Sequence, residues 1–222
     1  MCINAEVSLA TFITSTAMAG YLWYRNDTHN NDRPLAIWIF VIGMMQFFEY
    51  IMWTNMNNHS TVSKLSLIFI LLQPLSLAAA LYYYNSYNEF MYKGIPFGKY
   101  LLWTIIIISG IKVLYATYYV FIEKANEKWS STKGINCHLV WDFVKNYYNV
   151  PLVARPDKFY LAPLLIVPLL MKPFGPAGII YSIFGFITFH LSRYIYYWEW
   201  GSIWCWMVNI IGLFAISSKY MF

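Results

Sequence analysis

The chain has 222 residues, of which 59% are hydrophobic, 21% aromatic and only 11% charged. Soluble domains carry about a quarter charged residues, so this balance excludes an ordinary soluble domain and predicts a multi-pass membrane protein. The net charge of +5 is spread over loops without a run of Lys or Arg, which argues against nucleic-acid binding and favours contact with membrane lipids.

Apolar runs predict the helices in chain order. We place seven of them, at residues 3–24, 35–54, 62–84, 99–122, 159–171, 176–198 and 201–222. The fifth contains Pro163 and Pro168 and would extend only about 20 Å, so it either crosses with snorkelling ends or is re-entrant. The predicted fold is all-α: one domain over 1–222, a polytopic bundle of about seven transmembrane helices.

The longest connection is a 36-residue loop at 123–158, between the fourth and fifth helices, which we expect to cap the bundle outside the membrane. Apolar residues at helical spacing within 138–148 predict a short surface helix that buries Trp141. Lys and Arg in the short loops favour an external or lumenal N-terminus.

The second helix carries a carboxylic acid, Glu49, with Gln46 one turn away on the same face. A carboxylate in hydrocarbon is costly unless it is paired, protonated or facing a wet cavity. We expect a polar pocket in which His190 or Arg193 of the sixth helix is the nearest partner of Glu49. The further candidate members of this pocket are Lys112, Gln73 and Asn209. The alternative is a buried ion pair that only locks the second and sixth helices together.

The three cysteines, Cys2, Cys137 and Cys205, fall on one predicted face. A disulfide between Cys2 and Cys137 would pin the long loop over the bundle in an oxidising compartment. Free thiols are the alternative, and a Cys/His metal site is a third possibility that no CxxC or HxxxH spacing supports. We therefore predict no metal site and no cofactor.

Retinal binding is disfavoured for this seven-helix pattern. Retinal proteins hold a Schiff-base lysine deep in the last helix, whereas here the last helix has only Lys219, near its end, and Lys112 lies on the fourth.

Four motifs together carry a family resemblance. They are Met1-Cys2-x-Asn4-Ala5-Glu6-Val7-Ser8, Glu49-Tyr50-Ile51-Met52-Trp53, Gln73-Pro74 and His138-Leu139-Val140-Trp141. With them the chain resembles a family of small multi-pass membrane proteins found in giant viruses and microbes, for which no activity is established. That family usually has an aromatic residue after the cysteine, where this chain has Ile3. The resemblance implies that Glu49, Gln73 and His138 are family features.

Three functional hypotheses follow. The first is binding or transport of a small molecule, ion or lipid at the Glu49 pocket. The second is a structural role in the membrane of a viral particle or organelle. A homo-oligomer is an open possibility under each hypothesis. The third is a metal-dependent intramembrane lipid hydrolase, which needs several His plus an Asp or Ser within helices. Because only His190 is placed so, enzymatic activity is not expected.

Overall fold

Each of the seven apolar runs contains a helix in the computed structural model, which describes residues 4–28, 31–56, 59–134, 138–145, 149–156, 158–173, 175–196 and 208–217. The helices are α1 Ala5–Arg25, α2 Asp32–Thr54, α3 Ser60–Tyr83, α4 Phe97–Tyr118 with its π-helical extension η1 Tyr119–Glu123, α6 Lys158–Ile166 with the 3-10 turn η3 Val167–Leu170, α7 Pro176–Tyr196 and α9 Val208–Ser217. The prediction of a largely helical fold is confirmed.

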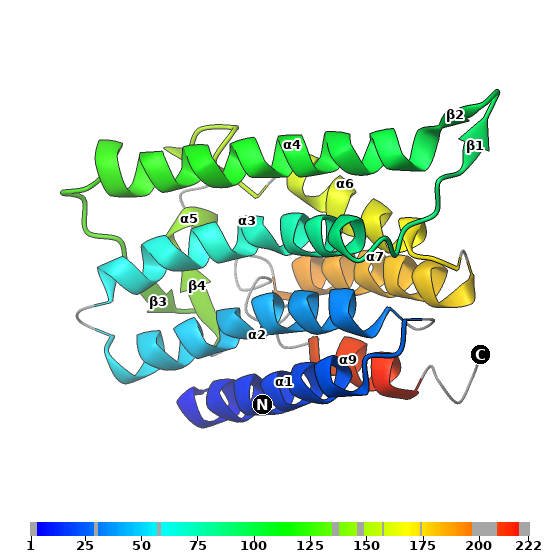
Figure 1. Cartoon of the computed structure of the whole chain (residues 1–222). Coiled ribbons are helices and arrows are strands. Elements are labelled where there is room, and N and C mark those ends of the chain that lie inside the picture. The colour runs from blue at the N-terminus through cyan, green and yellow to red at the C-terminus, as the bar shows by residue number, and fades with distance from the viewer. Residues whose placement is uncertain are drawn as a thin grey trace.

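The first four helices form a layer in which each one packs against the next along the chain (Figure 1). Behind this layer, α9 packs on α1 and α2, α6 packs on α3 and α4, and α7 packs on α6. In the described part of the chain, three helices are long and apolar enough to cross a membrane: Asp32–Thr54, Ser60–Tyr83 and Phe97–Glu123. Membrane character is therefore supported by length and composition at these three helices.

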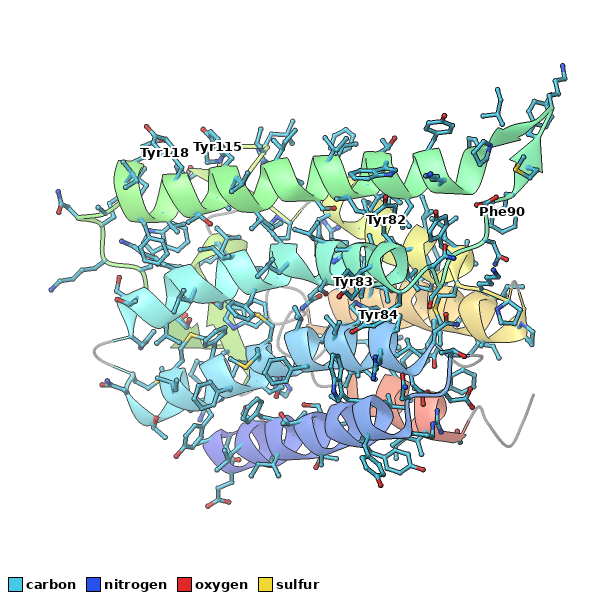
Figure 2. The ribbon with its side chains drawn as sticks, viewed as in Figure 1. Tyr82, Tyr83, Tyr84, Phe90, Tyr115 and Tyr118 are labelled. Atoms are coloured by element: carbon cyan, nitrogen blue, oxygen red, sulfur yellow. The ribbon has the colours of Figure 1, made fainter. Side chains whose placement is uncertain are left out.

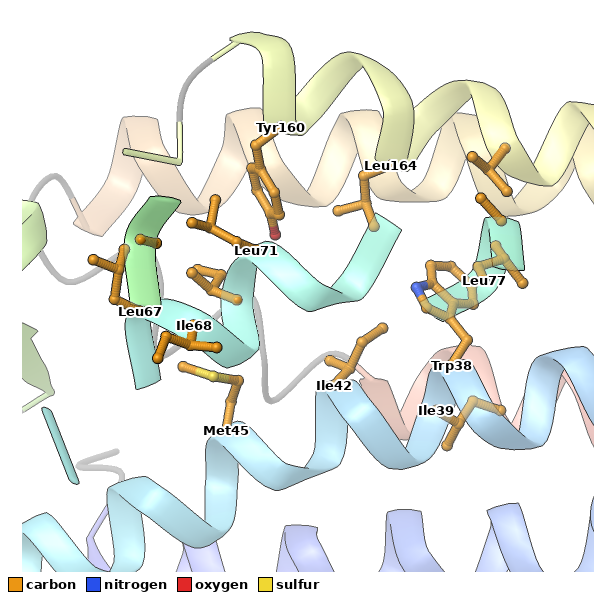
Figure 3. Close-up of a cluster of buried hydrophobic side chains, with 14 of the residues drawn as sticks. Trp38, Ile39, Ile42, Met45, Leu67, Ile68, Leu71, Leu77, Tyr160 and Leu164 are labelled. Atoms are coloured by element: carbon orange, nitrogen blue, oxygen red, sulfur yellow. The ribbon is translucent and has the colours of Figure 1, made fainter. Parts of the chain in front are cut away.

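The core lies between the two layers (Figure 3). Trp38, Ile42 and Met45 follow a four-then-three spacing, which places them on one face of α2. This face packs toward α3 and α6, where Leu71 and Leu164 are also buried. Since lipid tails are as apolar as these side chains, close packing and dispersion, rather than hydrophobic transfer, hold such helices together.

A glycine lets α1 and α2 approach closely. A Cβ atom at Gly43 would lie 2.3 Å from the hydroxyl oxygen of Ser15. Both residues are buried, so a side chain at position 43 would have to push the helices apart.

Arg25 joins three helix ends. Its guanidinium donates to Asp32 at the start of α2 (Nε to Oδ2, 2.6 Å) and to the carbonyl oxygens of Ile216 and Ala215 at the end of α9 (2.9 and 3.2 Å). The last carbonyls of a helix have no partner within the helix, so a cation is favourable there. This clamp sets α9 parallel to α1, because both helices end at the same guanidinium.

The long connection does not have the predicted surface helix. Strand β3 Ser131–Lys133 pairs antiparallel with β4 Leu139–Trp141, and only the four-residue helix α5 Asp142–Lys145 follows. The prediction of a helix from 138 is therefore wrong over 138–141, although the predicted burial of Trp141 is confirmed at 1% exposed. The physical reason is that backbone pairing with β3, whose Ser131 amide is held by His59, competes with the local helical pattern. A second hairpin joins α3 to α4, with β1 Met91–Tyr92 and β2 Ile95–Pro96.

The same connection returns along the bundle after α5. The Lys112 Nζ of α4 donates to the carbonyl of Leu152 (3.1 Å), and the Tyr119 hydroxyl donates to the carbonyl of Asn149 (3.2 Å). Lys112 lies eleven residues before the end of η1, a distance of about 15 Å along the helix. Residues 149–152 therefore run beside α4, with Leu152 about 15 Å from the C-terminal end of its extension η1.

Candidate functional site

Glu49 is completely buried in the interior of α2. Its side chain is 0% exposed, and so is that of Gln46, whose amide nitrogen donates to Glu49 Oε2 at 3.2 Å. The predicted neighbourhood of these two side chains on one helical face is confirmed. A hydrogen bond from a neutral amide to a carboxyl is weaker than one made by a cation.

The direction in which Glu49 points follows from its neighbours on α2. Trp38 and Met52 lie on the same four-three-four-three spacing as Glu49. Trp38 meets the ring of Tyr181 on α7 edge-on, with centroids 6.4 Å apart, and the Met52 sulfur accepts a hydrogen bond from the Ser131 hydroxyl of β3 at 3.0 Å. Glu49 therefore faces the second layer, between α7 and the β3–β4 hairpin.

Helix α1 presents a polar stripe to α2. Ser8, Thr11 and Ser15 are all buried, at a three-then-four spacing that places them on one face. The close approach at Gly43 sets Ser15 opposite Gly43, and the ring contact of Phe12 with Phe47 (5.0 Å) continues the same antiparallel register. Ser8 then lies at about the depth of Glu49. This stripe is not part of the predicted pocket, although the spacing of its three small hydroxyl residues was visible in the sequence.

Asn209 on α9 completes the group. A Cβ atom at Gly212 would lie 2.6 Å from Met18 Cε, so α9 touches α1 there. Because α9 runs parallel to α1, Asn209 lies one turn earlier, near the depth of Ser15. We call the resulting group the polar seam. Its members are Ser8, Thr11 and Ser15 of α1, Gln46 and Glu49 of α2, and Asn209 of α9.

The polar seam is rich in hydrogen-bond acceptors. Within the described residues, the buried Ser8 Oγ and Asn209 Oδ1 have no hydrogen-bond partner, and the Glu49 carboxyl adds a group that is an anion when ionised. From Gly43 to Glu49 the seam extends about 10 Å along α2. An arrangement of this kind suits a ligand that is a cation or carries several donors.

His190 and Arg193 do not join the polar seam. Both side chains are exposed on α7. The centroid of the His190 ring lies 4.3 Å from that of Phe186 and 5.4 Å from that of Phe189, both on the same helix. Among the described residues, no hydrogen bond or ion pair joins either side chain to Glu49. The buried residues of α7 include Tyr181, Ser182, Gly185, Thr188, Phe189 and Ser192. This stripe turns His190 and Arg193 outward, which corrects the predicted pocket at these two positions.

Two other predicted pocket residues, Gln73 and Lys112, form hydrogen bonds that join α3 and α4 to other segments. The Tyr160 hydroxyl of α6 donates to Gln73 Oε1 of α3 at 2.7 Å, and Lys112 reaches the carbonyl of Leu152. The Ser63 hydroxyl of α3 donates to the Met52 sulfur of α2 (3.5 Å), which places these two residues at the same depth. Counting along both helices from this contact, Gln73 lies about 10 Å from Glu49 along the helix axis. Gln73 therefore belongs to a separate interlayer contact.

Cys2 and Cys137 lie outside the described residues, as does Cys205, so their pairing stays a prediction. In the described part, no group of three or more His, Cys, Asp or Glu side chains could hold a metal ion.

Two cavities lie at opposite ends of the bundle, and Glu49 lines neither of them. One, of about 190 Å³, is lined by Tyr119, Glu127, Lys128, Trp129, Asp142, Phe143, Asn149 and Val150. The other, of about 360 Å³, is lined by Thr28, Tyr84, Asn85, Ser86, Lys172 and Pro173.

No protein-family model, no curated protein and no solved structure matches the chain. The resemblance to small membrane proteins of giant viruses and microbes stays a prediction that rests on its four motifs.

Proposed function

We propose that this is a multi-pass membrane protein of about seven helices that binds and transports a small cation through the polar seam. The observation that carries the proposal is the completely buried carboxyl of Glu49, together with two buried oxygens on the neighbouring helices α1 and α9, Ser8 Oγ and Asn209 Oδ1, that have no hydrogen-bond partner among the described residues. Intramembrane ionisable groups are rare because they are costly, and they mark ion and substrate pathways more often than packing sites.

The chemistry of the seam selects the ligand class. Hard cations and protonated amines are bound by carboxylate, amide carbonyl and hydroxyl oxygens, which are the groups that Glu49, Asn209 and Ser8 supply. A bound cation also offsets the cost of an ionised carboxyl in a low-dielectric interior. Binding of an anion would be unfavourable, because an ionised Glu49 repels it and none of the six residues of the seam is basic.

The seam lies close to one end of the bundle. Ser8 lies in the first turn of α1, and Glu49 lies five residues before the end of α2. Glu49 therefore lies about 5 to 8 Å of helix from that end, where Ser131 of the β3–β4 hairpin contacts Met52.

The test is ion flux in proteoliposomes. The purified full chain is reconstituted, and uptake of sodium, potassium and methylammonium ions is measured for the wild type, Glu49→Gln and the matched control Glu6→Gln. Glu6 is exposed in the first turn of α1 at the same end of the bundle. We expect at least one probe to be transported, with roughly a tenfold or larger loss in Glu49→Gln, since a charge-assisted contact is removed, and no loss in Glu6→Gln.

Equal flux in Glu49→Gln and Glu6→Gln would contradict the proposal. Glu49→Asp, which keeps the charge, serves as the variant that separates loss of function from loss of fold. The thermal unfolding of Glu49→Gln and Glu49→Asp is measured in the same detergent.

A structural role is the second candidate. It is favoured by the buried polar side chains that fasten one segment to another: Lys64, whose Nζ donates to the carbonyls of Lys124 and Ala125 at 2.8 and 2.9 Å, and Gln73 with Tyr160. Absence of flux for all three ions, together with recovery of the protein in stoichiometric amounts from a purified particle or organelle membrane, would favour this role.

A further inference from the structure

The larger cavity lies at the end of the bundle opposite the polar seam. It opens where the connection after α1, the connection after α3 and the segment after η3 meet. Its volume of about 360 Å³ falls within the range of small-molecule sites. It is lined by Thr28, Tyr84, Asn85, Ser86, Lys172 and Pro173.

The backbone that carries Lys172 is held from two sides. The Lys172 amide donates to the carbonyl of Ser86 at 3.0 Å, and the Asn31 side-chain amide donates to the carbonyl of Lys172 at 2.7 Å. One residue away, the Met171 carbonyl accepts from the side-chain amide of Asn88. The Lys172 side chain is exposed, so a fixed backbone presents a cation at the cavity.

Arg33 is a second cation next to the cavity, in contact with the lining residue Tyr84. The Arg33 guanidinium lies over the rings of Tyr84 and Trp23, at 5.7 and 5.4 Å from their centroids. Stacking of this kind orients the guanidinium but does not neutralise it. In the described part of the chain, neither Arg33 nor Lys172 makes an ion pair, while nearby Asp32 is engaged by Arg25.

The surroundings of the cavity resemble a membrane interface. Tyr82, Tyr83 and Tyr84 end α3 at this side of the bundle, while Tyr115 and Tyr118 lie toward the other end of α4 (Figure 2). Tyrosine is enriched at the level of lipid headgroups. The described basic residues at the cavity end are Arg25, Arg33, Lys93, Lys99 and Lys172, and the acidic ones are Asp27, Asp32 and Glu89. The balance at this end is positive, which favours an anion.

We propose that this cavity binds the phosphate group of an anionic phospholipid. Lys172 supplies a point charge to the phosphate oxygens, the Asn85 side-chain amide supplies a neutral donor, and Arg33 adds positive potential behind the Tyr84 ring. Phosphate recognition here is independent of cation binding at Glu49, since the two sites lie at opposite ends of α2.

The test is lipid retention measured by native mass spectrometry of the purified full chain. The protein is titrated with phosphatidylglycerol and, separately, with phosphatidylcholine. We expect one saturable phosphatidylglycerol adduct and roughly a tenfold weaker apparent affinity in Lys172→Gln and in Arg33→Gln, because each change removes one charged partner. The matched control is Lys93→Gln, which removes an exposed charge from the β1–β2 turn at the same end.

Competition with inorganic phosphate separates the two possible sources of the phosphate. Displacement of the lipid at millimolar phosphate shows that the group alone is recognised, and retention shows that the lipid as a whole is required; either result supports the site. Lys172→Arg should keep the adduct, which distinguishes loss of charge from loss of fold. The proposal is overturned if Lys172→Gln and Arg33→Gln retain phosphatidylglycerol as well as Lys93→Gln does.

Discussion

Arg25 and Asp32 show how single buried charges position the helices. Their side chains are 8% and 0% exposed, and the guanidinium also caps α9 through two carbonyls. The hydrogen bond with Asp32 raises the pKa of Arg25 above its usual value, against the opposing effect of burial. Arg25 therefore stays charged across the physiological pH range, and the clamp does not depend on pH through this group.

Breaking this pair from one side should destabilise the fold. We expect Arg25→Gln to lower the free energy of unfolding by about 3 kcal/mol, because it leaves the Asp32 carboxylate buried without its cation. The double variant with Asp32→Asn should lose less than the sum of the two single losses, since the two residues are coupled. Denaturant titration of the purified protein in detergent measures these changes. Arg193→Gln, at an exposed position on α7, is the control and should change stability little.

At the residue scale, the sequence was informative where a polar side chain interrupted an apolar run. The burial of Glu49 and Gln46 on one face could be predicted from spacing alone. The positions of His190 and Arg193 were predicted wrongly, because a polar side chain in an apolar run was expected to face inward, whereas the buried side of α7 is formed largely by small and hydroxyl residues such as Ser182, Gly185 and Ser192. Contacts such as that of Tyr181 with Trp38 decide the rotation of α7, and these are invisible in the sequence.

At the element scale, close helix contacts depend on small residues. Gly43 of α2 faces Ser15 of α1, whereas a Cβ atom at Gly20 would meet nothing within 4 Å. The two glycines are therefore a matched pair, one at an interface and one in an exposed position of a helix.

Gly43→Leu should destabilise the protein, and Gly20→Leu should not. The larger side chain at position 43 has to separate α1 from α2, and overpacking of this kind costs about 1 to 3 kcal/mol. At position 20 the change removes a flexible glycine from a helix and should be neutral or stabilising. Thermal unfolding in detergent compares the two variants; equal losses would contradict the close approach of the two helices.

The long connection marks the limit of prediction at this scale. Helices of about 20 residues could be placed from apolar runs because their hydrogen bonds are local. The β3–β4 hairpin could not, because it is anchored by a residue far away in the sequence, His59, whose Nε2 accepts from the Ser131 amide at 2.7 Å. The spacing of apolar residues around Trp141 correctly predicted that this side chain is buried, but it predicted a helix where the structure has strand β4.

At the scale of the whole molecule, the order of the helices implies which loops share a side. Helices α1 to α4 pack as neighbours in chain order and alternate in direction (Figure 1). If Phe97–Glu123 crosses a membrane, the β1–β2 turn and the start of the long connection lie on opposite sides. Lys93 and Lys128 are exposed markers of these two places.

Thiol labelling in sealed proteoliposomes tests this arrangement. In a background where Cys2, Cys137 and Cys205 are replaced by Ser, Lys93→Cys and Lys128→Cys are treated with a membrane-impermeant maleimide before and after lysis. In a preparation of uniform orientation, one of the two should react before lysis and the other only after it.

Two further variants complete the same experiment. Lys172→Cys should label with Lys93→Cys, because the Lys172 amide bonds to Ser86 at the end of the bundle that carries the β1–β2 turn. Leu152→Cys should react slowly from either side, because the Leu152 carbonyl is held by Lys112 well below the end of α4. Labelling of Lys93→Cys and Lys128→Cys from the same side would contradict a membrane crossing by α4. Rapid labelling of Leu152→Cys would show instead that the returning connection lies in water, and Lys112 with it.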